Sequence, residues 1–298
     1  MMSEEISDYR VVHSSPLILQ LAHFLQHNGI RGGHFLEETA RARGWLDVLV
    51  RFELSRNVRI DVPAFAGSYD LSNIHSYEHD LIGMLERRIS HSPGKPLTLL
   101  DCGADIGLFS ALLVASCDRI ERVIAFEPNS RSFAFLERNL KMLPLPGEAH
   151  NRAVADFVGK GELRYPDHDK DDHAAFIVPA EGGEIEVTTI DRLGLPSGQR
   201  LLMKIDVEGG ELAVVEGAQS TLASSSQFNV VFEAHRDQVG RTGIDPLTIV
   251  NFLNRISPCD VVVAEAPDTA VDLGRPFFDQ FPNRIYNVCV FSRQGVER

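Results

Sequence analysis

From residue 97 onward, short apolar runs alternate with segments of helical periodicity, and this alternation constrains the fold more than any other feature of the chain. Four runs are strongly apolar: LTLLD at 97–101, RVIAFE at 122–127, RLLMKID at 200–206 and FNVVFEA at 228–234. Runs of this kind belong to strands that are buried on both faces, and strands joined through helices pair in parallel. The pattern therefore predicts an α/β domain with a largely parallel, Rossmann-like sheet.

The other elements of this region have weaker signals. Apolar spacing predicts helices at 107–117, 129–142, 210–223 and 246–256. Further strands are expected near 148–154, 161–165, 184–190, 260–265 and 285–292.

The first 95 residues are organised differently. Helical spacing occurs at 16–28, 35–50 and 76–90, and alternation around Arg56-Asn57 predicts a short hairpin over 51–65. The breaker segment HSPGKP at 91–96 sets the boundary. We predict an α-rich extension over 1–95 and a Rossmann-like domain over 96–298. Covering the substrate and forming a homodimer both stay open as roles for the extension.

Composition and charge narrow the class of partner. The 298 residues are 44% hydrophobic and 24% charged, as in an ordinary globular protein, and their net charge is −13. No cluster of Lys and Arg offers the counter-charge that a phosphate backbone or an anionic membrane requires. We therefore expect no nucleic-acid and no membrane partner, and a neutral or cationic small molecule as ligand.

The chain also shows no sign of export, membrane insertion or metal binding. No secretory apolar segment opens it, and no run reaches the ~18 apolar residues of a membrane span. The four cysteines have no metal-ligand spacing: Cys102, Cys117, Cys259 and Cys289. We expect buried thiols, a cytoplasmic location and no metal.

The sharpest local motif is DCGADIG at 101–107, which follows an apolar strand directly and opens a helix. Gly103 and Gly107 allow a tight turn and a close approach of the backbone to a ligand. The GxxxG spacing does not match the GxGxxG fingerprint, which disfavours an NAD(P)-dependent oxidoreductase. An acidic loop is a poor pyrophosphate site but suits an amino group and a sulfonium, as in S-adenosylmethionine.

Three further strand ends carry groups suited to the same ligand. Glu127, at the second strand, can accept hydrogen bonds from both ribose hydroxyls, and the segment after 148 brings a small residue to the adenine edge. The fourth strand ends in two carboxylates before a Gly-Gly turn. The predicted cofactor-binding residues are Asp101, Gly103, Asp105, Gly107, Glu127, Pro128, Asn129, Asn151, Ala153, Asp206 and Glu208.

The motifs DCGADIG, AFEP, NRAVAD, KIDVEGGE, VVEGA and FNVVFEAH occur in this order, and together they resemble the FkbM family of methyltransferases over roughly residues 70–292. The resemblance implies a class I methyltransferase fold with a seven-stranded, mostly parallel sheet. It also implies S-adenosylmethionine as cofactor and O-methylation of a sugar or polyketide-like metabolite. One departure is Asp105, where similar sequences usually carry Asn; Asp can also accept from the amino group of the cofactor.

A hydroxyl is a weak nucleophile, so methyl transfer to it benefits from a general base. Glu233 and His235 lie two apart on a strand and so face one side. We predict His235 as the base, because its ordinary pKa is near 6.5, with Glu233 or Asp206 positioning it or the acceptor. Lys204 is expected to pair with a neighbouring carboxylate.

Other interpretations stay open. The Asp-rich segment PDHDKDDHAAF at 166–176 contains His168 and His173 but matches no metal motif, and we expect a solvated lid over the site. A non-catalytic cofactor-binding or regulatory module would keep the same fold. A nitrogen acceptor also remains open.

Overall fold

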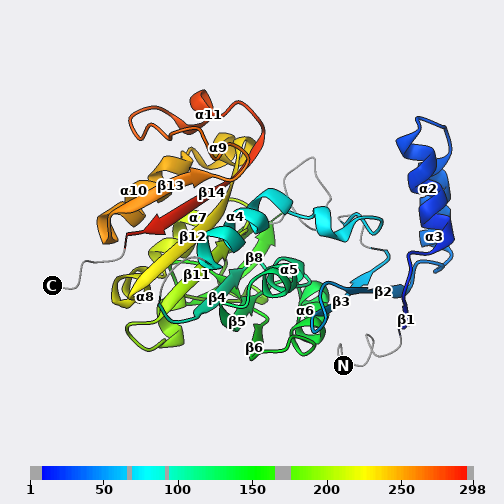
Figure 1. Ribbon diagram of the computed structural model, residues 1–298, viewed down its shortest axis with the longest axis horizontal. Helices are drawn as coiled ribbons and strands as arrows, with labels where there is room; N and C mark the ends of the chain where they lie inside the picture. Colours follow the sequence, from blue (N-terminus) through cyan, green and yellow to red (C-terminus); the bar gives the residue numbers. More distant parts are fainter. Residues whose placement is uncertain (1–8, 66–68, 91–93, 165–175, 294–298) are drawn as a thin grey trace.

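The computed structural model describes residues 9–65, 69–90, 94–164 and 176–293. Its centre is a seven-stranded sheet with the order β13-β14-β12-β11-β4-β5-β6 (Figure 1). The strands are β4 Leu97–Cys102, β5 Ile120–Phe126, β6 Gly147–His150, β11 Arg200–Ile205, β12 Gln227–His235, β13 Cys259–Val263 and β14 Ile285–Ser292. β14 runs in the opposite direction to the other six strands of this sheet. This confirms the expected class I methyltransferase sheet.

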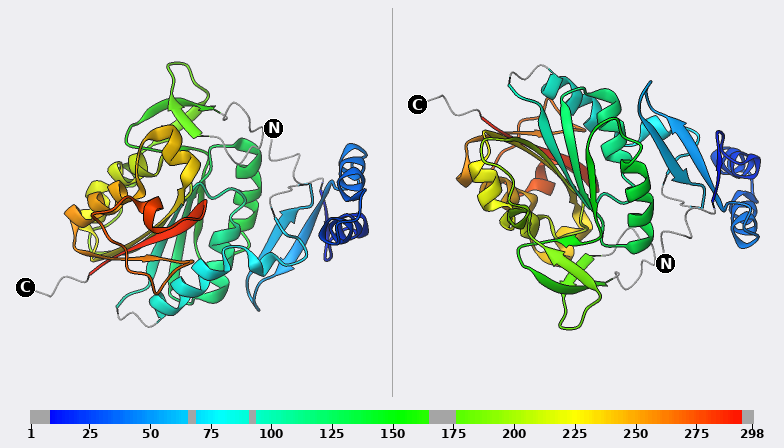
Figure 2. Two further views of the ribbon diagram at one scale, coloured as in Figure 1. Left: turned by 90° about the horizontal axis from the view of Figure 1, so that it is seen from above. Right: turned by 90° about the horizontal axis from the view of Figure 1, so that it is seen from below.

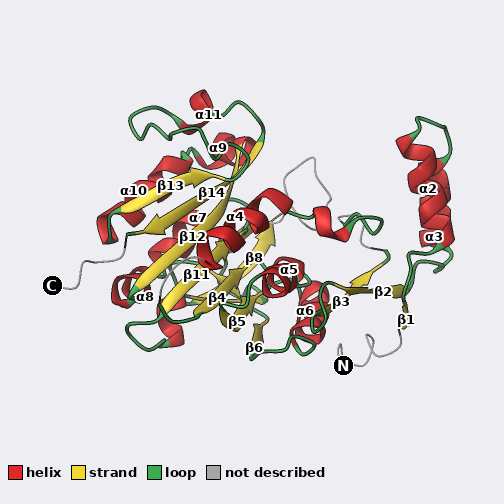
Figure 3. Ribbon diagram, viewed as in Figure 1, coloured by secondary structure: helices red, strands yellow, loops and turns green. Residues whose placement is uncertain are grey.

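Helices cover both faces of this sheet, as Figures 2 and 3 show. One layer holds α4 His79–Ser90, α5 Leu108–Ser116 and α6 Ser130–Leu140; the other holds α7 Glu211–Glu216, α8 Gln219–Ser224 and α10 Pro246–Ile256. Neighbouring strand residues point to opposite layers, so Leu99 packs with the first layer and Leu100 with the second. This two-sided burial explains the continuous apolar runs of the strands.

The strand order also locates the functional edge of the sheet. The chain leaves β4 for β5 and β6 on one side, and later returns to β11 and β12 on the other. The loops that follow the adjacent strands β4 and β11 therefore lead away from each other. Ligands of open α/β sheets bind outside the carboxyl ends of the strands at such a switch point.

A second, four-stranded sheet with the order β7-β10-β8-β9 follows β6 in the sequence. Its strands are β7 Ala153–Val154, β8 Gly159–Arg164, β9 Phe176–Pro179 and β10 Ile185–Thr188. The single strand expected at 148–154 is wrong, because the chain turns at 151–152 and its two halves join different sheets. β9 was not predicted.

Two predicted helices also need correction. The helix expected over 35–50 ends at Ala42, since Gly44 takes a left-handed conformation (φ 67°) and Val48 begins a buried strand. The helix expected over 210–223 is broken into α7 and α8 at Gly217, where a side chain would lie 2.1 Å from the Ala155 carbonyl oxygen. The short helices α9 Arg236–Thr242 and α11 Phe277–Gln280 were not predicted.

The N-terminal part contains a three-stranded sheet of β1 Arg10–Val12, β2 Val48–Glu53 and β3 Arg59–Pro63, which confirms the hairpin. The fully buried Asp61 ties it to α6, because its carboxylate pairs with Arg51 (2.7 Å) and Arg138 (2.8 Å). The same apolar core continues from this sheet to α5. The boundary at 95 therefore stays a prediction.

The remaining N-terminal elements are α2 Leu17–His27 and α3 Gly33–Ala42, which pack against each other and stand apart from the main body (Figure 1). A short 3-10 turn, η1 Ile74–Ser76, precedes α4. Within the described part of the chain, no helix combines the length and the apolarity needed to cross a bilayer.

Candidate cofactor and acceptor site

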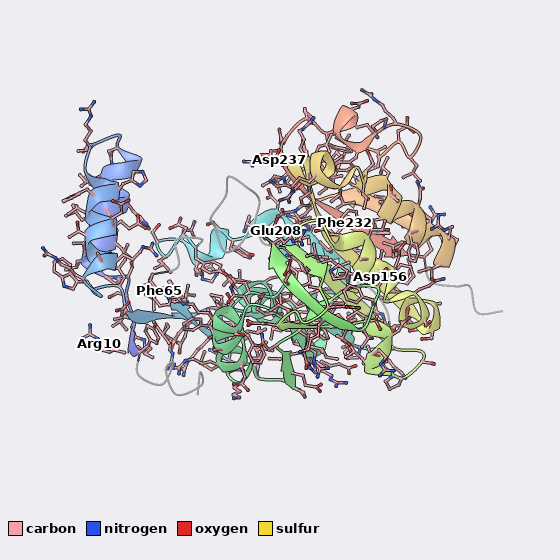
Figure 4. All side chains as sticks on the ribbon, turned by 180° about the vertical axis from the view of Figure 1, so that it is seen from behind. Arg10, Phe65, Asp156, Glu208, Phe232 and Asp237 are labelled. Atoms are coloured by element: carbon pink, nitrogen blue, oxygen red, sulfur yellow. The ribbon has the colours of Figure 1, made fainter. Side chains whose placement is uncertain are left out.

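A cavity of about 240 Å³ lies at the carboxyl ends of β4, β5 and β11. Of the residues predicted to bind cofactor, all but Gly107 and Asn151 line it. The structure therefore brings together groups that are more than a hundred residues apart in sequence, as the expected parallel sheet requires. Figure 4 labels Glu208 at this end of the sheet.

The turn after β4 forms the floor of the cavity. Asp101 is 1% exposed, and its Oδ2 accepts a hydrogen bond from Ser110 Oγ at 2.5 Å. Its Oδ1 is buried and has no hydrogen-bond partner among the described residues. Burial raises the pKa of this carboxyl group, against the lowering effect of Lys204. A buried acceptor without a partner is costly, so Asp101 is suited to a ligand donor.

Gly103 lies where β4 and β11 come closest. Its φ is +81°, and a Cβ atom there would lie 1.8 Å from the Asp206 carbonyl oxygen. Gly107, with φ +83°, caps α5 behind the cavity, where a Cβ atom would lie 2.9 Å from Leu136. Only glycine fits such positions without displacing the neighbouring backbone or side chain.

Glu127 closes the cavity at the end of β5. Its Oε2 accepts the Asp105 N–H (2.9 Å) and its Oε1 accepts the Asn129 N–H (2.8 Å). Burial, followed by the charge of Asp105, raises the pKa of Glu127 to about 8. The Asn129 side chain itself caps α6, and Asn151 donates to the carbonyl oxygens of Glu127 and Pro128 (2.8 and 3.1 Å). Asn151 thus holds the loop that presents Glu127.

Two tyrosines from the N-terminal part complete the wall of the cavity. Tyr69 donates a hydrogen bond from its hydroxyl to Asp105 Oδ2, and its ring lies 5.9 Å from that of Tyr77. Both rings line the cavity. Asp105 adopts a left-handed backbone conformation (φ 46°), which places its carboxylate toward Tyr69. Sequence analysis singled out neither tyrosine: Tyr69 lies in an irregular segment, and Tyr77 fell in the helix expected over 76–90, which begins only at His79.

Lys204 is a buried cation beneath the cavity. Its side chain is 2% exposed, and its Nζ lies 2.9 Å from Asp206 Oδ2 and 3.5 Å from Glu78 Oε1. Burial disfavours the lysine charge, but the carboxylates of Asp206, Glu78 and Asp101 outweigh it and raise the pKa of Lys204. The expected pairing of Lys204 with a carboxylate is confirmed. Glu78 was not predicted.

Three carboxylates gather near Lys204, at the ends of β11 and β12. Oxygen atoms of Asp206, Glu208 and Glu233 lie within 4.8 Å of one another. Burial, followed by the charge of Asp206, raises the pKa of Glu208 to about 7 and that of Glu233 to about 8. Glu208 also accepts a hydrogen bond from Gln238 Nε2 at 3.0 Å. With these pKa values Glu208 and Glu233 can exchange protons near neutral pH, and the carboxylate oxygens of all three residues are of the type that hard divalent cations bind. The metal-free site therefore stays a prediction.

His235 lies outside this cavity. It caps α9, and its Nδ1 accepts the Asp237 N–H at 3.1 Å. The ring borders a separate cavity of about 20 Å³ together with Glu233. Burial lowers the pKa of His235. The predicted lid over 166–176 lies, apart from Phe176, outside the described residues.

The raised carboxyl pKa values make a prediction about stability. Four buried or half-buried carboxyl groups titrate near pH 7 or 8 in the native state: Glu208, Glu211, Glu127 and Glu233. In the unfolded chain such groups ionise near pH 4.3, so the native state binds more protons and the free energy of unfolding falls as pH rises. His150 and His235, whose pKa values are lowered, oppose this only below about pH 6.5.

We therefore expect the melting temperature of the ligand-free protein to fall between pH 6.5 and 8. Each carboxyl group that is protonated in the native state but ionised in the unfolded chain lowers the free energy of unfolding by about 1.4 kcal/mol per pH unit. This corresponds to a fall in melting temperature of about 3 °C per pH unit. Differential scanning fluorimetry measures the slope. Glu233→Gln should flatten it, whereas the surface variant Glu148→Gln should not. A melting temperature that rises over this range would contradict the prediction.

Comparison with known proteins places this site in a family. Among curated protein sequences, none matches the chain. A solved structure of methyltransferase FkbM from Methylobacillus flagellatus KT is 15% identical, with a TM-score of 0.44, over 87% of this chain and 70% of its own. Precorrin-6y C5,15-methyltransferase from Geobacter metallireducens GS-15 is 14% identical, with a TM-score of 0.35, over 72% and 89%. M. jannaschii TYW2, solved with AdoMet, is 11% identical, with a TM-score of 0.36, over 82% and 84%.

The sequence model of the methyltransferase FkbM domain matches residues 101–257, which is more than half of the chain. The match begins at Asp101, at the end of β4, and runs through the loops after β5, β11 and β12. It therefore includes the strand ends that form the cavity, and this chain belongs to the FkbM methyltransferase family.

Proposed function

We propose that this chain transfers a methyl group from S-adenosylmethionine to a hydroxyl oxygen of a sugar or other small metabolite. The observation that carries the proposal is the unpartnered, buried Oδ1 of Asp101 in a cavity that Glu127 closes at the next strand end. When bound, the cofactor supplies a methyl carbon activated by a sulfonium. The protein's task is to orient the two reactants and exclude water.

The described residues fit this cofactor. Asp101 Oδ1 would accept from its amino group, and Glu127, whose oxygens retain acceptor capacity, would accept from the ribose hydroxyls. Gly103 leaves the backbone open to the ligand. Ala153, Val154 and Ile177 offer an apolar wall for the adenine.

The carboxylates that follow β11 suit proton removal from the acceptor. Asp206 and Glu208 line the cavity, and the pKa of Glu208, about 7, lets it accept a proton at neutral pH. We assign the base to Glu208, with Asp206 orienting the hydroxyl. His235 is a weaker candidate, because its Nδ1 is occupied by the Asp237 N–H and its ring does not line the cavity.

Calorimetric titration with S-adenosylmethionine and S-adenosylhomocysteine tests the cofactor assignment. We expect saturable binding that is at least tenfold weaker in Asp101→Asn and in Glu127→Gln, since each variant replaces an acceptor oxygen of a buried carboxyl group with an amide N–H donor. The matched control Glu148→Gln removes an exposed carboxylate on β6. Absence of binding to folded wild-type protein would refute the proposal. Binding without turnover on any acceptor would favour a non-catalytic module.

Turnover separates the candidate bases. In a screen of hydroxylated and amine acceptors, with S-adenosylhomocysteine release as readout, Glu208→Gln should lower kcat by 10²- to 10⁴-fold, the usual range for a general base. His235→Ala should change kcat less than about threefold. Mg²⁺ and EDTA added in parallel test the three-carboxylate group for metal dependence. A loss of kcat in His235→Ala as large as that in Glu208→Gln would restore His235 as base.

A further inference from the structure

The helical hairpin formed by α2 and α3 exposes an unusual amount of apolar surface. The side chains concerned lie on α2, on α3 and in the turns beside them: Leu17, Leu21, Phe24, Ile30, Phe35 and Trp45. Each is about half exposed or more, and Leu17 reaches 82%. Figures 1 and 4 show the hairpin standing away from the main body. The rest of the described chain therefore leaves about half or more of each of these residues uncovered.

The helix α2 is apolar on two opposite faces. Leu19 and Ala22 are buried on the side of the hairpin core. Leu17, Leu21 and Phe24, spaced i, i+4 and i+7, form an exposed stripe on the other side. A helix with apolar side chains on two opposite faces usually packs on both faces, so the outer stripe of α2 is suited to a second packing partner.

The size of the exposed surface matches a protein interface. At about 200 Å² for a whole residue, the six side chains present on the order of 700 Å². A monomer's largest apolar patch is typically ~300–600 Å², and a standard interface buries ~800 Å² on each partner. The hairpin as a whole therefore exposes nearly as much apolar surface as one side of a stable interface buries, and the outer stripe of α2 accounts for about half of it.

The charge of the stripe favours a second copy of this chain as the partner. Helix α2, with the sequence LILQLAHFLQH, has no Asp, Glu, Lys or Arg, although the chain carries a net charge of −13. Two copies can thus meet here without repulsion. A stripe with this spacing is also self-complementary when two helices pack antiparallel.

We propose that the chain forms a homodimer in which α2 packs antiparallel against α2 of a second copy. Leu21 then lies near the two-fold axis, and Leu17 packs against the partner's Phe24. The two hairpins together form a four-helix arrangement that buries the outer stripe. The interface is isologous, so it closes at two copies.

Light scattering and sedimentation over a range of concentrations test the dimer. Wild type should be dimeric, and Leu21→Glu should raise the dimer dissociation constant at least a hundredfold, because two unpaired charges would be buried at the axis. The control Val158→Glu places the same charge on an exposed apolar residue far from the hairpin in sequence. A monomeric wild type, including one that binds lipid vesicles instead, would overturn the proposal. So would a dimer that Leu21→Glu leaves intact.

Cross-linking tests the antiparallel arrangement. All four native cysteines are buried, so an introduced surface cysteine reacts selectively. A mixture of Leu17→Cys and Phe24→Cys proteins should form a covalent dimer on mild oxidation, whereas Leu17→Cys alone should not. Val158→Cys serves as the control for random collision. If Leu17→Cys alone forms a covalent dimer, and the mixture forms no more of it, the helices pack in parallel and the proposed geometry is refuted. Both experiments are independent of methyl transfer.

Discussion

Replacing Gly103 with alanine is expected to abolish cofactor binding. The added Cβ atom would lie 1.8 Å from the Asp206 carbonyl oxygen. Cβ atoms in proteins essentially never come within 3.0 Å of such an atom. Because that oxygen belongs to the backbone just after β11, relief requires the strand ends of β4 and β11 to separate. Asp101 and Asp206 lie on those two strand ends, so the cavity would lose its shape. We expect binding of S-adenosylmethionine to fall at least a hundredfold, as measured by calorimetry.

The matched control is Gly198→Ala. Gly198 has nearly the same φ, +77°, but no atom lies within 4 Å of its added Cβ position. This variant therefore carries the strain of a left-handed alanine, roughly 1 kcal/mol, without the clash. Its cofactor affinity should equal that of the wild type. Circular dichroism tests whether Gly103→Ala is folded. A folded Gly103→Ala protein that binds the cofactor with wild-type affinity would contradict the described contact between the two strand ends.

The sequence was sufficient to predict the fold because the relevant signals are local. Strands such as β4 and β11 are apolar on both faces, and DCGADIG marks the turn at 101–107 without any knowledge of distant residues. Parallel pairing then requires the ends of these strands to meet at one edge. For that reason Asp101, Glu127 and Asp206 were expected together, and the structure places all three at one cavity.

The part of the site around Lys204 depends on contacts between distant segments that no local pattern encodes. Tyr69, Tyr77 and Glu78 reach the site from the irregular segment before α4, and Glu78 approaches Lys204 only through the tertiary fold. The alternation rule placed Glu233 and His235 on one side of β12, and both border the small second cavity, but His235 is the last residue of the strand and its side chain caps α9. Alternation along a strand identifies which side chains share a side, but it does not tell which cavity that side borders.

The buried cation beneath the site leads to the second large effect. Lys204→Met is expected to destabilise the protein by about 3–5 kcal/mol, since it leaves Asp206, Glu78 and Asp101 without their common counter-charge. The control Lys160→Met removes an exposed lysine 3.7 Å from Glu186 and should cost less than about 1 kcal/mol. Denaturant titration measures both free energies of unfolding.

The double variant Lys204→Met/Asp206→Asn distinguishes charge from packing as the cause. If the loss arises from uncompensated carboxylates, removing one of them should return part of the stability, so the double variant should be more stable than Lys204→Met alone. The Asp206→Asn single variant should be milder than Lys204→Met, because Glu78 and Asp101 still face the lysine. If the double variant instead loses the sum of the two single effects, Lys204 acts through the packing of its side chain and the charge explanation fails. Partial recovery in the double variant would show that the buried carboxylates around Lys204 destabilise the protein when the charge of Lys204 is removed.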